Sequence, residues 1–192
     1  MLEPAPANPW RLTARRVMYT NPWTTLIEDD ILGPSGAPGL YGYFQRKDCI
    51  LIAAVDDTKQ LHLVRQWRWA FEHSTWELPC GTCEADEDPL AAAKRELQEE
   101  TGYTAARWKA LGSMCHSDAR VAGCIHLFYA SELSPSPPLA GDHEEQDLVA
   151  AAIPLHEAVA ACHDGRIDHA SSVALILRLA HLLTADLPPS PQ

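Results

Sequence analysis

The stretch from Asp88 to Gly102 constrains the fold of this 192-residue chain more than any other feature. Asp88 is a good N-cap, Pro89 suits the first helical position, and Gly102 suits the residue that ends a helix. The residues between them, PLAAAKRELQEET, contain no helix breaker after Pro89. The sequence therefore predicts a helix that begins at residue 89 and ends before Gly102.

Three glutamates share one face of this predicted helix. Glu96, Glu99 and Glu100 are separated by three and four residues, so their side chains are neighbours. Like charges at this spacing destabilise an isolated helix by roughly 0.2–0.5 kcal/mol per pair. Hard divalent cations such as Mg²⁺ take oxygen ligands and offset this repulsion. The plain alternative is a solvated acidic face. Arg95 is adjacent and can pair with one carboxylate and fix its rotamer.

The rest of the chain predicts an α/β fold with a mixed sheet between helices. Residues 49–55 (CILIAAV) and 61–65 (LHLVR) read as a β-hairpin that turns at Asp56 and Asp57. A short strand is expected at 76–79, and further strands near 107–113, 124–130 and 148–153. Two more helices are expected, at 155–163 and after a Ser171 cap.

The expected organisation is one main domain with two smaller flanking segments. Residues 1–45 form a β-rich segment broken by turn residues, residues 46–183 form the main domain, and residues 184–192 form a loose tail. The small N-terminal β subdomain contains Trp10, Trp23, Tyr41 and Tyr43. Each of these rings can stack on a base, or belong to a core or an interface.

Composition excludes several classes of partner. The net charge of −11 disfavours nucleic acid and anionic membranes. No apolar run approaches the ~20 residues of a membrane span, and no signal peptide is apparent at the start, so a cytoplasmic location is expected. The six cysteines are then expected to be free thiols. Cys80 and Cys83 form a single C-x-x-C, which without a second pair is read as incidental rather than as a zinc or redox site.

The residues around the predicted helix resemble the signature of the Nudix family. Its box pattern is matched, with the right intervals, by Gly81, Glu87, Arg95, Glu96, Leu97, Glu99, Glu100 and Gly102. Only the last box position departs mildly, because Tyr103 replaces an aliphatic residue. The resemblance implies a Nudix α/β/α sandwich in which the box is a loop–helix–loop that holds divalent metal.

The resemblance also implies roles for individual residues. Glu96, Glu99 and Glu100 match the metal ligands, and Cys80 matches a residue whose backbone carbonyl binds metal. Arg95 matches the arginine that orients a ligand carboxylate. Glu87 matches a more structural glutamate. The implied cofactor is Mg²⁺, with Mn²⁺ as an alternative.

Similarity beyond the box points to the branch of ADP-ribose and nucleotide-sugar pyrophosphatases. The sequences LVRQWR (residues 63–68) and WELP (residues 76–79) are similar to that branch, and Arg68 then matches a phosphate contact. The acidic residues 142–147 resemble its mobile loop, which makes Glu144 and Glu145 candidates for the general base, with Glu145 preferred. The resemblance further implies a homodimer whose N-terminal segment helps to bind the nucleotide, with Trp23 and Arg46 as candidate contacts. For each of these residues the alternative is a purely structural role.

One departure concerns the substrate. Many ADP-ribose enzymes carry a Ser-Pro-Gly turn and a later glutamate, where this chain has Ser117-Asp118-Ala119 and Gly123. The expected function is Mg²⁺-dependent hydrolysis of a nucleoside diphosphate linked to a sugar, with ADP-ribose, giving AMP and ribose 5-phosphate, as the best single candidate. The alternatives are another nucleotide sugar such as GDP-mannose, or a Nudix domain that senses a nucleotide without turnover.

Overall fold

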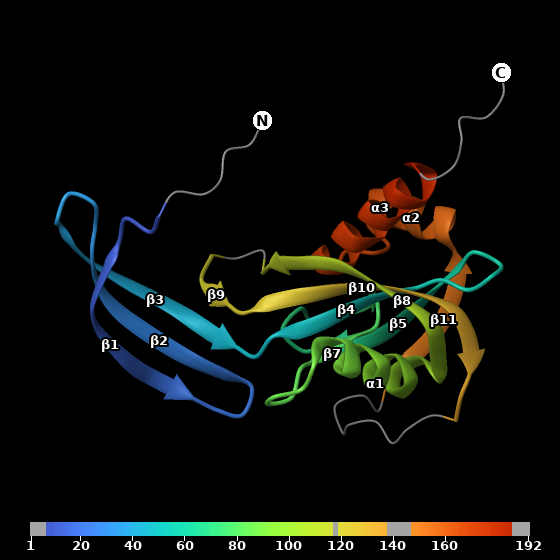
Figure 1. Ribbon diagram of the computed structural model, residues 1–192, viewed down its shortest axis with the longest axis horizontal. Coiled ribbons are helices and arrows are strands. Elements are labelled where there is room, and N and C mark those ends of the chain that lie inside the picture. Colours follow the sequence, from blue (N-terminus) through green and yellow to red (C-terminus); the bar gives the residue numbers. More distant parts are fainter. Residues whose placement is uncertain (1–6, 117–118, 138–146, 186–192) are drawn as a thin grey trace. The chain divides into compact units, whose positions relative to one another are not determined.

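The computed structural model describes residues 7–116, 119–137 and 147–185 of the chain (Figure 1). In chain order its elements are β1 (Arg11–Thr20), β2 (Thr24–Leu32), β3 (Pro38–Arg46), β4 (Cys49–Ala54), β5 (Gln60–Arg68), β6 (His73–Glu77), β7 (Cys80–Thr82), α1 (Pro89–Thr101), β8 (Tyr103–Cys115), β9 (Val121–Ala122), β10 (Cys124–Pro135), β11 (Val149–Pro154), α2 (Leu155–Asp164) and α3 (Ala170–Ala185).

The chain forms two compact units, each with its own internal contacts. Unit 1 comprises residues 1–47 and 116–123, and unit 2 comprises residues 48–115 and 124–192. No pattern in the sequence indicated that residues 116–123 join the N-terminal segment.

Unit 1 is a four-stranded sheet in the order β1-β2-β3-β9. Its first three strands are antiparallel, and β9 pairs in parallel with the end of β3. Every residue of β1 is exposed, and Ile27 and Asp29 of β2 are the buried residues in the described part of this unit. The sheet therefore has almost no core of its own.

Unit 2 contains a mixed sheet, β7-β4-β10-β8, and an antiparallel sheet, β11-β5-β6. In the mixed sheet β4 and β10 are parallel, whereas β8 runs antiparallel to β10. Helices cover both sides, so the expected α/β Nudix sandwich with a mixed sheet is confirmed (Figure 1).

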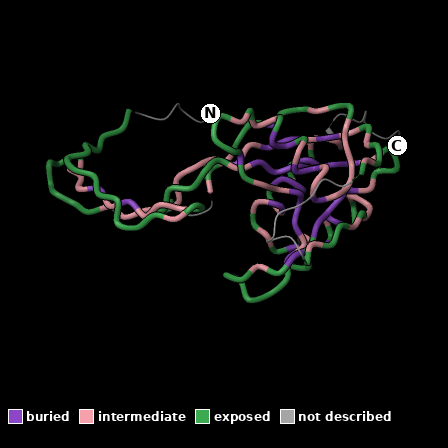
Figure 2. The backbone as a smooth tube through the Cα atoms, turned by 90° about the horizontal axis from the view of Figure 1, so that it is seen from below, coloured by how far each residue is buried: buried purple, intermediate pink, exposed green. Residues whose placement is uncertain are grey.

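Strand β4 shows why this architecture suits the sequence. Successive side chains of a strand point to opposite faces. Leu51, Ala53 and Val55 pack in a cluster with Leu175, Ile176 and Leu179 of α3. Ile50, Ile52 and Ala54 pack in a second cluster with Ala93 and Leu97 of α1. The run CILIAAV is apolar throughout because both faces of its strand are covered by helices (Figure 2).

The hairpin expected from residues 49–55 and 61–65 is wrong. Strand β4 pairs with β7 and β10, whereas β5 pairs with β6 and β11, and a single bridge joins Val55 to Leu61. The turn itself forms, since the Asp56 carboxylate accepts hydrogen bonds from the backbone N–H groups of Thr58 and Gln60. Beyond the turn, β4 and β5 form their ladder hydrogen bonds with other strands.

The ends of α1 match the sequence prediction. The Asp88 side chain accepts hydrogen bonds from the N–H groups of Leu90 and Ala91 at 3.0 and 3.1 Å, and Gly102 ends the helix with φ 70°. The predicted Ser171 cap is wrong, because α3 already begins at Ala170. None of the helices among the described residues is long and apolar enough to cross a membrane.

Candidate active site

The three glutamates of α1 lie at its junction with the core of unit 2. Glu96 and Glu100 are buried, with 6% and 4% of their surface exposed, and Glu99 is half-buried. Buried carboxylates must be compensated by hydrogen bonds, ion pairs or metal. The cluster is therefore more than the solvated acidic face that the sequence left open.

Strand β7 lies against two of these carboxylates. The backbone N–H of Cys80 donates to Glu100 Oε2 at 2.9 Å. At Gly81 there is no room for a side chain, because a Cβ atom there would overlap the Glu96 carboxylate. Glycine at position 81 thus allows Glu96 to approach the backbone of β7, a close approach that the box spacing alone cannot reveal.

Arg95 connects the glutamates to one another. It donates to Glu96 Oε1 at 2.7 Å and to Glu99 Oε2 at 2.9 Å. It also makes two bonds of 3.1 Å to Glu87, whose pKa is held below its usual range mainly by these hydrogen bonds. Arg95 therefore orients three carboxylates, where the sequence predicted one.

Arg68, the predicted phosphate contact, is engaged by a buried carboxylate. Its guanidinium forms a bidentate pair with Glu77 at 2.7 and 2.6 Å, and its Nη2 lies 3.9 Å from Cys80 Sγ. A third of the Arg68 side chain remains exposed, whereas Glu77 is fully buried. Arg68 is thus pre-oriented next to β7 with part of its surface still accessible.

The buried network around Glu77 was not found by sequence reasoning. Burial raises the pKa of Glu77, but the hydrogen bonds of Arg68 and the nearby His169 outweigh burial, and the net pKa is below its ordinary value. Thr75 also donates to Glu77. Ser172 of α3 accepts from the Leu78 N–H at 2.9 Å and contacts His169 Nδ1 at 2.8 Å. The only available signal was that Glu77 stands between apolar residues of the WELP segment.

The C-x-x-C pair does not form a reactive site. Burial, followed by the charge of Glu100, raises the pKa of the Cys80 thiol well above its ordinary value. Burial also raises the pKa of the Cys83 thiol. Thiolates are the form that attacks disulfides, so these environments oppose a nucleophilic or redox role for either thiol.

The remaining predicted residues belong to unit 1 or lie outside the described part of the chain. Trp23, which is 63% exposed, and Arg46 belong to unit 1. Glu144 and Glu145 lie outside the described residues. Their roles stay predictions.

The segments that flank Glu144 and Glu145 in the sequence are anchored within unit 2. On one side, Gln98 of α1 donates to Ser136 Oγ at 3.0 Å and to the Pro137 carbonyl at 3.1 Å. On the other side, Asp147 accepts from the backbone N–H of Trp67, next to Arg68, at 2.7 Å. The described residues on either side of the acidic segment therefore contact the box helix and the strand that carries Arg68.

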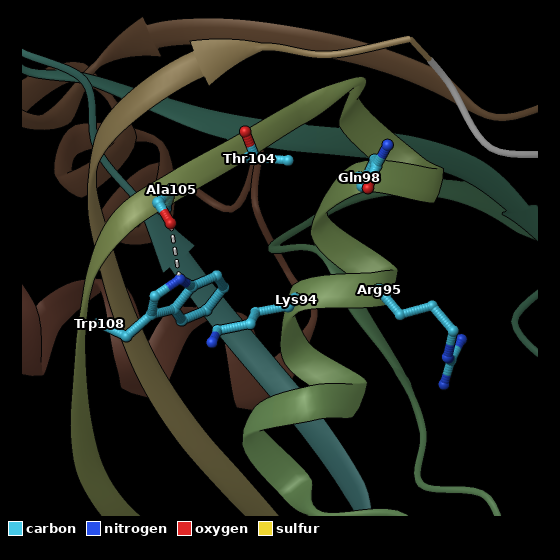
Figure 3. A pocket seen from close by; sticks show the side chains of 6 residues that line it. All are labelled: Lys94, Arg95, Gln98, Thr104, Ala105 and Trp108. Atoms are coloured by element: carbon cyan, nitrogen blue, oxygen red, sulfur yellow. Dashed lines mark hydrogen bonds between the residues drawn. The ribbon is translucent and has the colours of Figure 1, made fainter.

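A pocket of about 400 Å³ lies beside α1 (Figure 3). Its lining residues are Lys94, Arg95, Gln98, Thr104, Ala105 and Trp108. Trp108 Nε1 donates to the Ala105 carbonyl at 3.0 Å, and the Lys94 side chain extends toward the Trp108 ring in Figure 3. By helical periodicity Lys94 and Gln98 occupy a different face from Glu96 and Glu100, so this hollow adjoins the carboxylate cluster but is not part of it.

The donor set of the cluster fits Mg²⁺ and not a soft metal. The side-chain donors are carboxylate oxygens from one helix face, and Gly81 allows the Glu96 carboxylate to lie against the backbone of β7. Oxygen-only coordination is what Mg²⁺ and Mn²⁺ prefer.

Comparison with known proteins agrees with this geometry. The model of the NUDIX domain family matches residues 45–176, which includes the whole box and most of unit 2. The chain belongs to the Nudix family.

Relatives identify the branch of this Nudix hydrolase. It is 30% identical to a methanol dehydrogenase activator of Bacillus methanolicus over 77% of this chain and 80% of that protein. It is 26% identical to an ADP-ribose pyrophosphatase of Mycobacterium tuberculosis over 91% of this chain and 84% of that protein. The second similarity supports the ADP-ribose pyrophosphatase-like branch.

A solved structure shows the same fold. The crystal structure of an ADP compounds hydrolase superimposes with a TM-score of 0.82, covering 95% of this chain and 98% of that one at 20% identity. At this identity the match bears on the fold alone.

Proposed function

We propose that this Nudix protein hydrolyses the diphosphate bond of a nucleoside diphosphate linked to a sugar, with ADP-ribose as the best candidate and AMP and ribose 5-phosphate as products. The observation that carries the proposal is the cluster of Glu96, Glu99 and Glu100. Arg95 holds Glu96 and Glu99, the Cys80 N–H binds Glu100, and Gly81 allows Glu96 to approach β7. The carboxylates of this cluster would repel the negative charge of a diphosphate. The cluster therefore suits such a substrate only when a divalent cation is bound between the carboxylates and the phosphates.

The chain's own residues would prepare the site for catalysis. Glu96, Glu99, Glu100 and the Cys80 carbonyl would hold Mg²⁺ or Mn²⁺. When bound, the metal neutralises phosphate charge and lowers the pKa of a coordinated water. Arg95 fixes the rotamers of Glu96 and Glu99, so that their positions are set before substrate arrives. The exposed part of Arg68 would bind a phosphate oxygen, with Glu77 holding the guanidinium in place.

A carboxylate of the acidic segment would serve as general base. Glu145, with Glu144 as the alternative, is two residues before Asp147, which is bound to the backbone beside Arg68. The other flank of the segment is bound to the box helix through Gln98. These anchors support a base that acts at the box and takes a proton from the attacking water.

A second substrate class, nucleotide sugars such as GDP-mannose, is favoured by one observation. Gly123, at the position of the glutamate of many ADP-ribose enzymes, has φ +121°, and an added Cβ would lie 3.1 Å from the Arg46 carbonyl oxygen. A glutamate is therefore strained in this backbone conformation. The contact made by that glutamate in ADP-ribose enzymes must be replaced or lost, and either change alters specificity.

The proposed assembly is a homodimer formed through unit 1. Strand β1 is exposed along its whole length and carries Val17, Met18 and Tyr19 with more than half of each surface in solvent. Contiguous exposed apolar residues of this kind favour a protein partner. A second copy of the chain would cover these three residues. In this dimer, Trp23 and Arg46 of unit 1 would contact the nucleotide.

A cytoplasmic location remains the expectation from the sequence.

A substrate panel tests the proposal. Purified protein with Mg²⁺ is offered ADP-ribose, ADP-glucose, GDP-mannose, NADH, diadenosine polyphosphates and nucleoside triphosphates, and nucleoside monophosphate release is measured. We expect ADP-ribose to be cleaved best and the double variant Glu99→Gln, Glu100→Gln to be inactive. Glu157→Gln, an exposed glutamate of α2, is the matched control and should retain activity.

The other outcomes are equally informative. Preferential cleavage of GDP-mannose would replace ADP-ribose as the substrate and make the Gly123 departure a determinant of specificity. Binding of ADP-ribose with a rise in melting temperature but without cleavage of any compound would overturn the catalytic proposal in favour of a sensor.

A further inference from the structure

Asp48, Cys124 and His126 form a compact cluster of three different kinds of metal-ligating side chain, none of which belongs to the Nudix box. One ligand atom from each residue lies within 4.8 Å of the other two. His126 Nε2 is 3.3 Å from Cys124 Sγ and 3.4 Å from Asp48 Oδ2. All three residues belong to unit 2.

The parallel pairing of β4 and β10 brings these residues together. Cys124 and His126 are two residues apart on β10, so their side chains share one face of the sheet. Asp48 immediately precedes β4, whose first residue, Cys49, is the register partner of Ile125. The Cys124 N–H donates to Asp48 Oδ1 at 2.9 Å, which fixes one oxygen of the carboxylate and leaves the other directed at His126.

The contacts of His126 distinguish a metal site from a nucleophilic triad. In a triad the histidine contacts the nucleophile through one ring nitrogen and the carboxylate through the other. Here the same atom, Nε2, faces both the Cys124 sulfur and the Asp48 oxygen. Three donors therefore converge on one point in space.

We propose that Asp48, Cys124 and His126 bind a divalent transition metal, with Zn²⁺ the best fit, at a site distinct from the glutamate cluster. Neighbouring ligands of a tetrahedral zinc ion with ordinary bond lengths are about 3.3–3.7 Å apart. The two contacts of His126 have that separation before any rearrangement. A sulfur, nitrogen and oxygen donor set suits Zn²⁺, whereas Mg²⁺ prefers oxygen alone.

The site is accessible from solvent, and three protein ligands would leave one position of a tetrahedral zinc ion for another ligand. Asp48 retains 47% and His126 28% of the side-chain surface exposed, so a metal ion can enter from solvent and keep a water or another exchangeable ligand. Asp48 and Cys124 are also the residues at which the chain enters unit 2 from unit 1. Metal binding would cross-link these two entry points and stabilise the first residues of β4 and β10.

The test uses the full chain in reducing buffer with saturating Mg²⁺, which occupies carboxylate sites. Zn²⁺ binding is measured by calorimetry, and Co²⁺ is added separately as a spectroscopic probe. We expect one Zn²⁺ per chain, an increase in melting temperature, and a Co²⁺ spectrum with a thiolate charge-transfer band and intense tetrahedral visible bands. Cys124→Ser and His126→Gln should each weaken Zn²⁺ binding by at least about a hundredfold.

Matched variants separate this site from other thiols, imidazoles and carboxylates. Cys162→Ser in α2 and His181→Gln in α3 should bind Zn²⁺ as the unchanged protein does, and so should Glu99→Gln, Glu100→Gln. Circular dichroism and melting without metal verify that each variant folds. Equal Zn²⁺ affinity in folded Cys124→Ser and His126→Gln, or a Co²⁺ spectrum without a thiolate band, would overturn the proposal whether or not the protein hydrolyses ADP-ribose.

Discussion

Strands β1 and β4 have opposite surroundings. All ten residues of β1 in unit 1 are exposed, whereas five of the six residues of β4 in unit 2 are buried (Figure 2). Unit 2 has two helix-covered faces and its own core, and unit 1 has a sheet held by ladder hydrogen bonds and surface ion pairs. From this difference we predict that unit 2 carries most of the stability of one chain, and we propose that another surface covers unit 1.

The largest expected effect separates chemistry in unit 2 from binding in unit 1. Glu99→Gln, Glu100→Gln should lower kcat by about a thousandfold or more, since preorganised charge stabilisation is lost. Trp23→Ala in unit 1 should instead raise KM and change kcat little. Steady-state kinetics on the best substrate of the panel measures kcat and KM of both variants. A Trp23→Ala variant with a lower kcat and an unchanged KM would contradict the assignment of chemistry to unit 2 and of binding to unit 1.

The next comparison concerns ion pairs. Glu77→Gln should lower the free energy of unfolding by about 3–5 kcal/mol, because it leaves the Arg68 charge half-buried without its partner. Asp30→Asn breaks a bidentate pair of similar length with Arg16, but both side chains are 42% exposed, and solvent screens them. Urea unfolding should show a much smaller decrease in the free energy of unfolding for Asp30→Asn than for Glu77→Gln. Equal decreases would contradict the expectation that the buried ion pair of unit 2 stabilises the chain more than the exposed pair of unit 1.

A matched pair of leucines tests the cores directly. Leu51→Ala in β4 should cost about 2–5 kcal/mol, because it removes a buried side chain from the cluster with α3. Leu12→Ala in β1, where the leucine is 50% exposed, should change stability by no more than about 0.5 kcal/mol at concentrations where the protein is monomeric. A large loss for the Leu12 variant in the monomer would show that β1 is covered within its own chain.

Oligomeric state tests whether a second copy covers unit 1. Light scattering after size-exclusion chromatography should give twice the chain mass of 21.1 kDa. Val17→Lys, which places a charge among the exposed apolar residues of β1, should shift the protein toward the monomer and leave the melting of unit 2 nearly unchanged. Val149→Lys is the control, since Val149 is an exposed valine of unit 2. A monomer at all concentrations rules out the proposed assembly.

The smallest effect is a pH dependence located in unit 2. The folded-state pKa of Glu77 is lower than its ordinary value of 4.5, so the charged form is favoured by folding. Its contribution to stability is complete above the unfolded-state pKa and is lost as the pH falls through the folded-state pKa. The difference in unfolding free energy between the unchanged protein and Glu77→Gln should therefore be constant near neutral pH and shrink below about pH 4.5. A difference that grows on acidification contradicts the assigned direction.

Local sequence was sufficient for α1 and for the identity of the glutamate cluster. Asp88, Pro89 and Gly102 act through neighbouring backbone groups, and helical periodicity brings Glu96, Glu99 and Glu100 to one face without help from distant residues. The strand at CILIAAV was also predicted from the sequence, because the apolar run has strand length and is followed by turn residues.

Tertiary structure alone decided which strands pair and what lies beside the glutamates. The predicted β4–β5 hairpin failed because β10 and β11, more than sixty residues away in the chain, supplied the pairing partners. For the same reason no local pattern could reveal that Asp48 meets Cys124 and His126. Arg68 and Glu77 are only nine residues apart, and they meet because β5 pairs with β6. Sequence determines interactions within a helix turn or a tight turn, whereas contacts across a sheet depend on register, and register is set by the packing of the whole core.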